Sequence, residues 1–256
     1  MRHGEYRETL AVKEFLDAYI SLLDESVADQ PFTLTTGLEH ESVDAELHRE
    51  TIETELTKIT PAIQSYASDI ELHDWARRLP AASKRVLTMS ALGFKAHAYA
   101  ITFRLSHKVA QTALAAKRPT EHIAAILKRL GLRDFVFVFE YSDSESEENH
   151  PLHIHGIAII PDELLIELTR EQVNTDGELQ QSKLRAALAP DYRERWGNKA
   201  IDIQPIQTPV RWVRYMIQEI TQTSSRLDAS PDYATQSASR IGQELYAEIR
   251  RLAGNR

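Results

Sequence analysis

Two histidines on one face of a predicted strand are the residues of this sequence best placed to bind a metal ion. His153 and His155 flank one apolar residue in the segment HPLHIHGIAIIP, residues 150–161, which reads as a β-strand. Alternate strand residues share a face and lie roughly 7 Å apart, so both imidazoles can reach one ion. An unpaired polar ring is costly to bury on an apolar strand, and this penalty favours a metal site over a chance pair among ten histidines.

A carboxylate just upstream can supply a third ligand. The run FVFVFEYSD, residues 135–143, is a second predicted strand, and the polar loop SDSESEENH follows it and leads back into the histidine strand. If the two strands pair as an antiparallel hairpin, Glu140 lies close to His153. The sequence therefore predicts a His-His-Glu metal site.

A helix predicted at residues 209–223 carries a tyrosine that is available for chemistry. At ~100° per residue, one face of this helix is apolar and is expected to be buried. That face consists of Val213, Met216, Ile217 and Ile220. Tyr215 points almost opposite, on a polar face beside Arg211, where its hydroxyl can act as a nucleophile. A surface tyrosine with no role would show the same pattern.

Length and composition are those of an ordinary globular protein that can bury a sizeable core. The chain has 256 residues, of which 42% are hydrophobic, and it contains no cysteine, which excludes disulfides and thiolate metal sites. No apolar run approaches the ~20 residues of a membrane-spanning helix, and the amino terminus MRHGEYRE is too charged for a signal peptide. We therefore expect a cytoplasmic protein with no membrane partner.

The net charge of −8 conceals a strongly basic segment. Residues 81–133 contain ten Lys or Arg residues and one acidic residue, a net charge of +9. Such a block can bind the phosphates of a nucleic acid, or it can be the solvated side of ordinary helices. Three aromatic residues within it, Phe94, Tyr99 and Phe103, could stack on bases or belong to the core.

The pattern of elements predicts an α+β fold, with a central antiparallel sheet that carries the histidine strand and is flanked by helices. Strands are expected at residues 31–37, 134–160 (as a hairpin) and 200–206. Helices are expected at residues 6–24, 41–60, much of 84–130, 162–172, 180–189, 209–223 and about 240–253. Residues 223–239 read as a linker.

Three segments in this order resemble the HUH superfamily of DNA-nicking enzymes, in particular the rolling-circle replication initiators called Rep proteins. The first is FTLTT at residues 32–36, and the second is His153, Ile154 and His155, with Glu140 as the acidic third ligand. The last is Tyr215 within VRYMIQEI. The resemblance covers residues 31–222 and implies a nicking domain at 1–223, which includes an N-terminal helical region, followed by a linker and C-terminal helix at 224–256.

The resemblance implies a metal-dependent single-strand endonuclease and strand transferase that initiates replication of a plasmid or phage. Mg²⁺ or Mn²⁺ held by His153, His155 and Glu140 would polarise the scissile phosphate, and Tyr215 would attack it, leaving a 5′-phosphotyrosine and a 3′-hydroxyl primer. The implied partners are single-stranded or hairpin origin DNA, with a host helicase and polymerase. The residues assigned to DNA binding are Thr35, Arg211, Arg214 and Gln218.

The tyrosine helix departs from the family pattern at one position. Many members have lysine three residues after the tyrosine, whereas this chain has Gln218, so Arg211 or Arg214 would have to position the phosphate. Glu219 lies four residues after Tyr215 on nearly the same helical face. We hypothesise that Glu219 activates water when strand transfer ends; alternatively, it only pairs with a cation such as Arg211.

Other functions are compatible with the same motifs. A relaxase or transposase of the same superfamily would use the same chemistry, although relaxases often carry the tyrosine near the amino terminus. A DNA-binding module that keeps the fold without catalysis is a third possibility. A nucleotide hydrolase of the HIT type is disfavoured, because Ile157 stands where its third histidine would fall.

Overall fold

The computed structural model describes residues 74–76, 79, 81–141, 152–173, 179–192, 200–218, 220–227 and 229–252. The chain divides into two compact units, residues 1–96 with 240–256 and residues 97–239, and each is described by itself. The helices expected at 6–24 and 41–60 and the strand expected at 31–37 lie outside the described residues.

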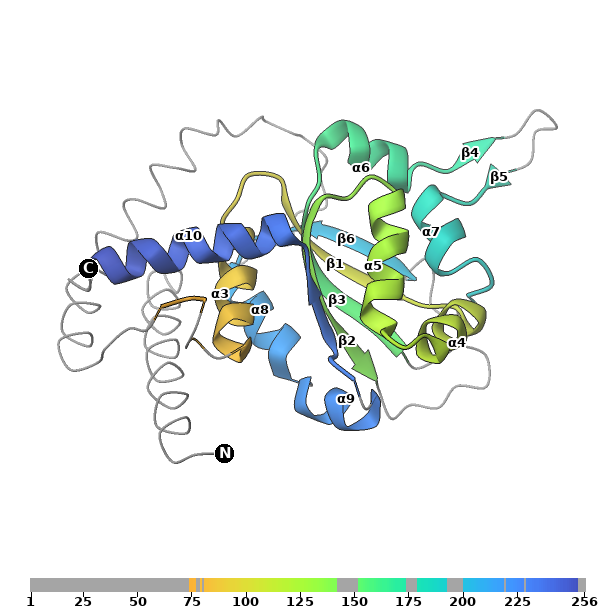
Figure 1. Ribbon diagram of the computed structural model, residues 1–256. Helices are drawn as coiled ribbons and strands as arrows, with labels where there is room; N and C mark the ends of the chain where they lie inside the picture. The colour runs from red at the N-terminus through yellow and green to blue at the C-terminus, as the bar shows by residue number, and fades with distance from the viewer. Residues whose placement is uncertain are drawn as a thin grey trace. The chain divides into compact units, whose positions relative to one another are not determined.

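The second unit is built on a five-stranded antiparallel sheet with the order β6-β1-β3-β2-β7 (Figure 1). The strands are β1 (Ala98–Arg104), β2 (Asp134–Tyr141), β3 (Leu152–Ile159), β6 (Ile201–Pro205) and β7 (Asp232–Ala234). The expected hairpin forms β2 and β3, with Glu140 directly opposite His153. The histidine strand β3 is therefore the central strand, hydrogen-bonded on both sides.

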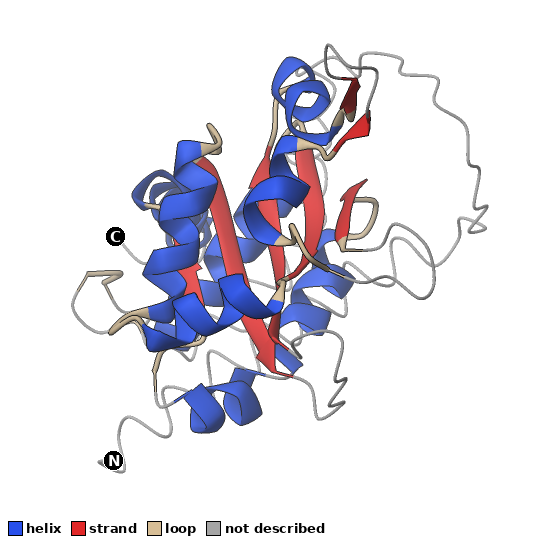
Figure 2. Ribbon diagram, turned by 90° about the vertical axis from the view of Figure 1, so that its right-hand side faces the viewer, coloured by secondary structure: helices blue, strands red, loops and turns tan. Residues whose placement is uncertain are grey.

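One face of this sheet is aromatic and aliphatic and forms the main core. Alternation along β2 puts Phe135, Phe137 and Phe139 on this face, where they pack with Phe103 of β1 and Ile154 of β3. Among the described helices, four supply buried apolar residues that cover it: α4 (His107–Ala115), α5 (Pro119–Arg129), α6 (Asp162–Thr169) and α7 (Lys183–Leu188). Figure 2 shows these helices in front of the strands.

The opposite face of the sheet carries the polar residues. Glu140 is the cross-strand partner of His153, and Thr102 is the partner of His155. Core residues occupy the alternate positions of these strands, so the four polar residues share the opposite face. Helix α8 (Pro209–Gln218) contacts this face, and α9 (Ile220–Leu227) follows it. The α+β class, a central antiparallel sheet flanked by helices, is thus confirmed.

Three sequence expectations differ from the structure. Residues 98–104, expected within a mainly helical stretch, form the strand β1, and Tyr99 and Phe103 are core residues there and unavailable for stacking on bases. The stretch 223–239, expected to be a linker, contributes β7, which pairs with β2. The helix expected at 209–223 is described as α8 and α9. A two-stranded ribbon of β4 (Gln172–Val173) and β5 (Leu179–Gln180) completes this unit.

The first unit contains α3 (Ala81–Gly93) and most of α10 (Gln236–Leu252). Gly242 of α10 lies directly against Thr88 of α3, so closely that a Cβ at residue 242 would stand 2.5 Å from the Thr88 Oγ1. Trp75 packs its ring on Tyr246 of α10, with ring centroids 5.8 Å apart. Within the described part of the chain, no helix is long and apolar enough to cross a membrane.

Candidate metal centre

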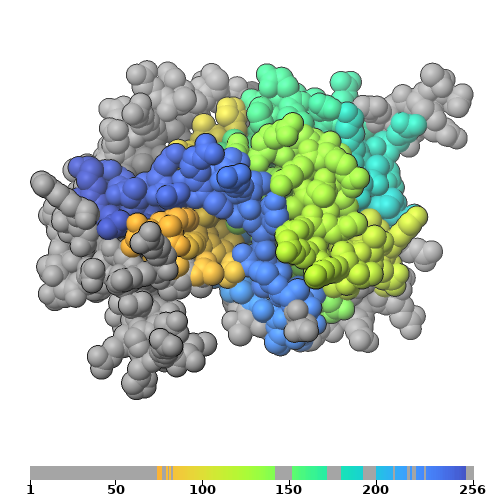
Figure 3. Space-filling view, viewed as in Figure 1, coloured from red at the N-terminus to blue at the C-terminus, as the bar shows by residue number. Residues whose placement is uncertain are grey.

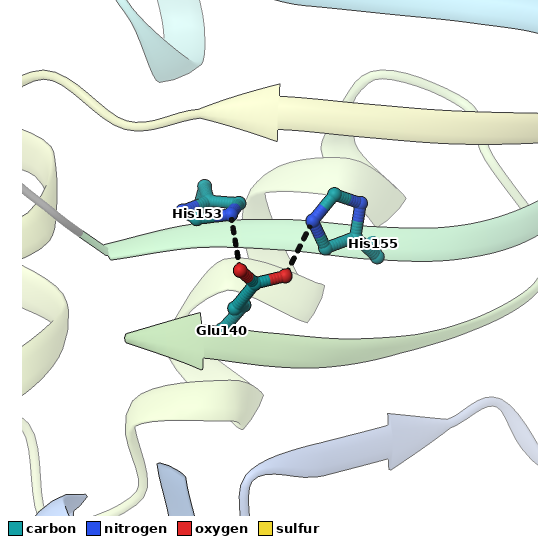
Figure 4. Close-up of side chains that lie close together, drawn as sticks. All are labelled: Glu140, His153 and His155. Carbon is teal, nitrogen blue, oxygen red and sulfur yellow. Dashed lines mark ion pairs between the residues drawn. The ribbon is translucent and has the colours of Figure 1, made fainter. Parts of the chain in front are cut away.

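Glu140, His153 and His155 form a group that could hold a metal ion. One ligand atom from each residue lies within 4.8 Å of the others. The carboxylate lies between the two rings, with Oε1 3.3 Å from Nε2 of His153 and Oε2 2.8 Å from Nε2 of His155 (Figure 4). Two imidazole nitrogens and a carboxylate oxygen are a usual donor set for a divalent cation. The residues present therefore fit such an ion chemically.

Strand pairing brings the three ligands together. Glu140 and His153 are direct cross-strand partners in β2 and β3, and such side chains lie about 5 Å apart at their Cβ atoms. His155 lies two residues along β3 on the same face. The site thus needs only the register of one hairpin, which the alternation of core residues along β2 determines.

The site favours an ionised carboxylate and a neutral imidazole. Hydrogen bonds from His153 and His155 hold the pKa of Glu140 well below its usual range. Burial lowers the pKa of His155, although the hydrogen bond to Glu140 opposes this shift. A cation requires these protonation states, since protonated imidazole is no ligand.

Thr102 of β1 contacts the other nitrogen of His155. Its Oγ1 lies 3.0 Å from Nδ1 of His155, and both residues are buried. While Nε2 donates its proton to Glu140, Nδ1 accepts from the threonine hydroxyl. If Nε2 binds a cation instead, Nδ1 carries the proton and donates to the same hydroxyl. A hydroxyl group can serve both arrangements because it both donates and accepts.

Tyr215 reaches the candidate metal centre from a separate element. Its hydroxyl lies 3.5 Å from Nε2 of His155, and the two rings meet edge to face with centroids 4.9 Å apart. Val213 and Met216 are buried as the helical pattern predicts, and Tyr215 projects from a different side of α8. The Tyr215 side chain is 45% exposed, so a molecule in solvent can also reach it.

The remaining predicted residues fall into two groups. Arg211 and Arg214 are exposed on α8, the same helix as Tyr215. Gln218 ends α8, and only its backbone is described, whereas Thr35 and Glu219 lie outside the described residues. Their assignment to DNA binding, or to water activation in the case of Glu219, stays a prediction.

Most of the basic segment in the second unit lies away from the candidate metal centre. Lys108 belongs to α4, and Arg118, Lys128 and Arg129 lie at or within α5, the helices that cover the aromatic face of the sheet. Arg118 pairs with Glu121, and Lys128 donates to the hydroxyl of Tyr233. In Figure 3, which has the view of Figure 1, these helices form the surface over the sheet. These basic residues therefore lie on helices that cover the face of the sheet opposite to the histidines.

Sequence reasoning missed three residues around the centre. Thr102 and Arg104 lie on β1, which was interpreted as helix, and Arg104 is the cross-strand partner of His153. The run AYAITF, residues 98–103, is rich in aromatic and β-branched residues and was the available signal for a strand. Trp212 precedes Tyr215 by three residues, and only its packing reveals its position.

Comparison with known protein families, with curated proteins and with solved structures gives no significant match. A function for this chain must therefore be inferred from its own residues and their geometry.

Proposed function

We propose that this protein is a metal-dependent enzyme that cuts one strand of DNA with Tyr215 as nucleophile and remains attached to the cut end. One observation carries the proposal: the Tyr215 hydroxyl lies 3.5 Å from Nε2 of His155, beside a Glu-His-His group that could hold a cation. This contact supports a role for Tyr215, because the buried histidine that it meets belongs to the group that could hold a cation. The order of the motifs along the chain supports the same function.

Glu140, His153 and His155 would hold the ion, which when bound would offset the negative charge that develops on the scissile phosphate. The phenol of Tyr215 would then lie beside the phosphorus. Because an ordinary tyrosine has a pKa near 10, positive charge close to the phenol would favour its ionised, nucleophilic form. The half-exposed position of Tyr215 leaves room for a strand to approach.

The reaction is a transesterification. A bond forms between the Tyr215 oxygen and phosphorus while the bond from phosphorus to the 3′ oxygen breaks. The phenol loses its proton and the 3′ oxygen gains one, so the products are a 5′-phosphotyrosine and a free 3′-hydroxyl. The phosphodiester energy is retained in the new bond, and the strand can be rejoined or extended from its 3′ end.

Phosphate contacts would come from the exposed arginines of α8. Arg211 and Arg214 lie on the same helix as Tyr215, so a strand whose phosphate meets the phenol would pass close to both. The charge of Arg211 and Arg214 would substitute for that of the lysine that many members of the HUH superfamily have at the position of Gln218. We propose origin DNA of a plasmid or phage, in single-stranded or hairpin form, as the substrate, with a host helicase and polymerase acting on the nicked product.

The physiological ion would be Mn²⁺ or Mg²⁺. Mixed nitrogen and oxygen ligands suit manganese, whereas magnesium prefers oxygen ligands but is abundant in cells. Isothermal titration of the metal-free protein with each ion, and with Glu140→Gln as the comparison, would measure the preference. Loss of one ligand is expected to weaken metal binding by at least tenfold, because even the loss of a residue that only hydrogen-bonds a ligand weakens affinity by about that factor.

Formation of a covalent adduct tests the proposed function. The full chain is incubated with Mn²⁺ and a library of labelled single-stranded and hairpin oligonucleotides, and denaturing gels reveal protein that carries DNA. We expect an adduct that requires the metal and disappears both with EDTA and in Tyr215→Phe. Tyr233→Phe is the matched control, since that tyrosine lies on the opposite, aromatic face, where its ring stacks on Phe135.

Each alternative function predicts a different result. DNA binding without an adduct in the wild type would favour the non-enzymatic module. An adduct that persists in Tyr215→Phe would contradict the role of this phenol, and Tyr192 would be the next residue to test. Preference for an origin hairpin over transfer-origin or transposon-end sequences would separate a replication initiator from a relaxase or transposase. Glu219→Gln with unchanged hydrolysis of the adduct would contradict the proposed base.

A further inference from the structure

Trp212 and Tyr215 form a stacked pair on α8. They lie three residues apart, so their side chains project from neighbouring turns of the same helix face. Their ring centroids are 5.4 Å apart and the planes differ by 25°. Both rings also meet His155 edge to face, at 5.8 Å for Trp212 and 4.9 Å for Tyr215. The indole thus covers one face of the phenol beside the metal centre.

The indole is itself attached to the histidine strand. Its Nε1 donates a hydrogen bond of 2.8 Å to the backbone oxygen of Gly156, the residue that follows His155 on β3. A strand backbone at the centre of a sheet is among the most rigid parts of a fold. The hydrogen bond therefore ties α8 to a point one residue away from a candidate ligand.

Tyr215 needs such a restraint because half of its side chain faces solvent. An exposed tyrosine changes rotamer on the picosecond to nanosecond timescale, and another staggered χ1 moves its hydroxyl by several ångströms. A nucleophile must be held close to its target, since a displacement of about 1 Å can reduce a rate by ~10². Its weak hydrogen bond to His155, at 3.5 Å, is a poor anchor on its own.

We propose that Trp212 is a positioning residue, which holds the Tyr215 phenol at the metal centre by stacking on it and by anchoring to the Gly156 carbonyl. This inference rests on the proposed function, because it assigns the nucleophile a support. Trp212 does not itself touch the reacting atoms. Its two interactions have separate roles: the hydrogen bond orients the indole, and the stack orients the phenol.

Two substitutions separate these roles. Trp212→Phe keeps an aromatic face but removes the indole N–H, and we expect the rate of adduct formation to fall about tenfold, as when one modest hydrogen bond is removed. Trp212→Ala removes both interactions, and we expect a fall of ~10², the effect of a small misplacement. The KM for the oligonucleotide and the Mn²⁺ affinity should stay close to wild type, because neither variant removes a ligand or an exposed arginine.

A measurement that needs no DNA follows the phenol directly. 3-Fluorotyrosine is introduced at residue 215 alone, and its ¹⁹F resonance is recorded with and without Mn²⁺. A fluorine this close to a paramagnetic ion at Glu140, His153 and His155 is strongly broadened in the wild type. In metal-free Trp212→Ala the ring is free to change rotamer, so we expect a narrower line than in the metal-free wild type and a shift toward that of free tyrosine. Trp212→Phe should lie between the two.

The two readouts distinguish failure of this inference from failure of the proposed function. If the wild type forms no adduct, the proposed function is wrong, but a fluorine line that narrows in Trp212→Ala still supports the positioning role. If the fluorine line is equally broad in both proteins, or is not broadened by Mn²⁺ in the wild type, Trp212 does not hold the phenol at a metal centre. Should Trp212→Ala fail to fold, Trp212→Phe decides by the same criteria.

Discussion

The hydroxyl of Tyr215 lies 3.5 Å from Nε2 of His155, although 60 residues separate them in the sequence. The histidine is 5% exposed at the centre of a sheet, whereas the tyrosine is half exposed on a helix. A buried candidate ligand and an accessible phenol therefore lie close together. This geometry combines what cation binding and attack on a large substrate each require.

Thr102 is expected to contribute to metal affinity through His155. Thr102→Val keeps the shape of the side chain but leaves Nδ1 of buried His155 without its hydroxyl partner, and we expect roughly tenfold weaker Mn²⁺ binding by isothermal titration. Thr102→Ser retains the hydroxyl and should bind within about twofold of wild type. Equal affinities of the Val and Ser variants would contradict a role for this hydrogen bond.

The metal-free protein should lose stability in mild acid because of His155. Its pKa is lower in the folded state than the ordinary 6.5, so between these two values the unfolded chain binds the extra proton and unfolding becomes easier. The lowered pKa of Glu140 adds a further loss below its ordinary value of 4.5. Urea unfolding in EDTA from pH 7.5 to 4 should therefore show a falling free energy of unfolding.

The comparison with His155→Asn isolates this effect from the other histidines. Because asparagine does not titrate, the difference in free energy of unfolding between wild type and variant should change as the pH falls below about 6.5, with the wild type losing more. A difference that stays constant from pH 7.5 to pH 5 would show that burial does not lower the pKa of this ring.

DNA binding is expected on the α8 side of the sheet. Replacing Arg211 and Arg214 together by glutamine should weaken binding of single-stranded DNA and reduce the slope of log affinity against log salt by about 0.7 for each phosphate that is no longer neutralised. Arg118→Gln is the matched control, since this exposed arginine stands at the start of α5 and pairs with Glu121. Fluorescence anisotropy at several salt concentrations gives both quantities. A larger effect from Arg118→Gln would place DNA on the opposite face.

Gly242 should be required for the packing of α10 on α3. Alanine is the better helix former by about 1 kcal/mol, yet its Cβ would lie 2.5 Å from Thr88 Oγ1 and 2.7 Å from Thr88 Cα. The backbone cannot move away as a flexible side chain would, so we expect Gly242→Ala to destabilise the protein by about 1–3 kcal/mol. Gln243→Ala, at an exposed neighbouring position, should be close to neutral in the same urea titration. A Gly242→Ala variant as stable as wild type would contradict this close helix contact.

Several elements could be predicted from local patterns because their signals are short-range. The alternation of FVFVFEY and the apolar residues around His153 predict β2 and β3, and the loop between them predicts their pairing. The apolar stripe of α8 likewise predicts that Val213 and Met216 are buried and that Tyr215 faces away from the core. The candidate ligands follow from these elements, because cross-strand neighbours are a property of one hairpin.

The strand β1 was missed for a physical reason. Its residues AYAITFR contain alanine, which suits helices, and the segment lies between two genuinely helical stretches. It becomes a strand because β3 and β6 both pair with it, and this tertiary context outweighs a weak local preference. The same holds for β7, whose three residues have no periodicity to detect and gain their structure by pairing with β2.

Spacing and residue type were therefore sufficient to indicate two imidazoles and a carboxylate on one hairpin, a tyrosine on the polar side of an amphipathic helix and an α+β architecture. Only the packed chain decided which side of the sheet α8 covers, that Thr102 stands behind His155, and that Trp212 joins Tyr215 to the Gly156 carbonyl. Hydrophobic periodicity is a local property that repeats within a few residues. Contacts between elements depend on how buried surfaces fit together across the whole core, and no segment carries that information alone.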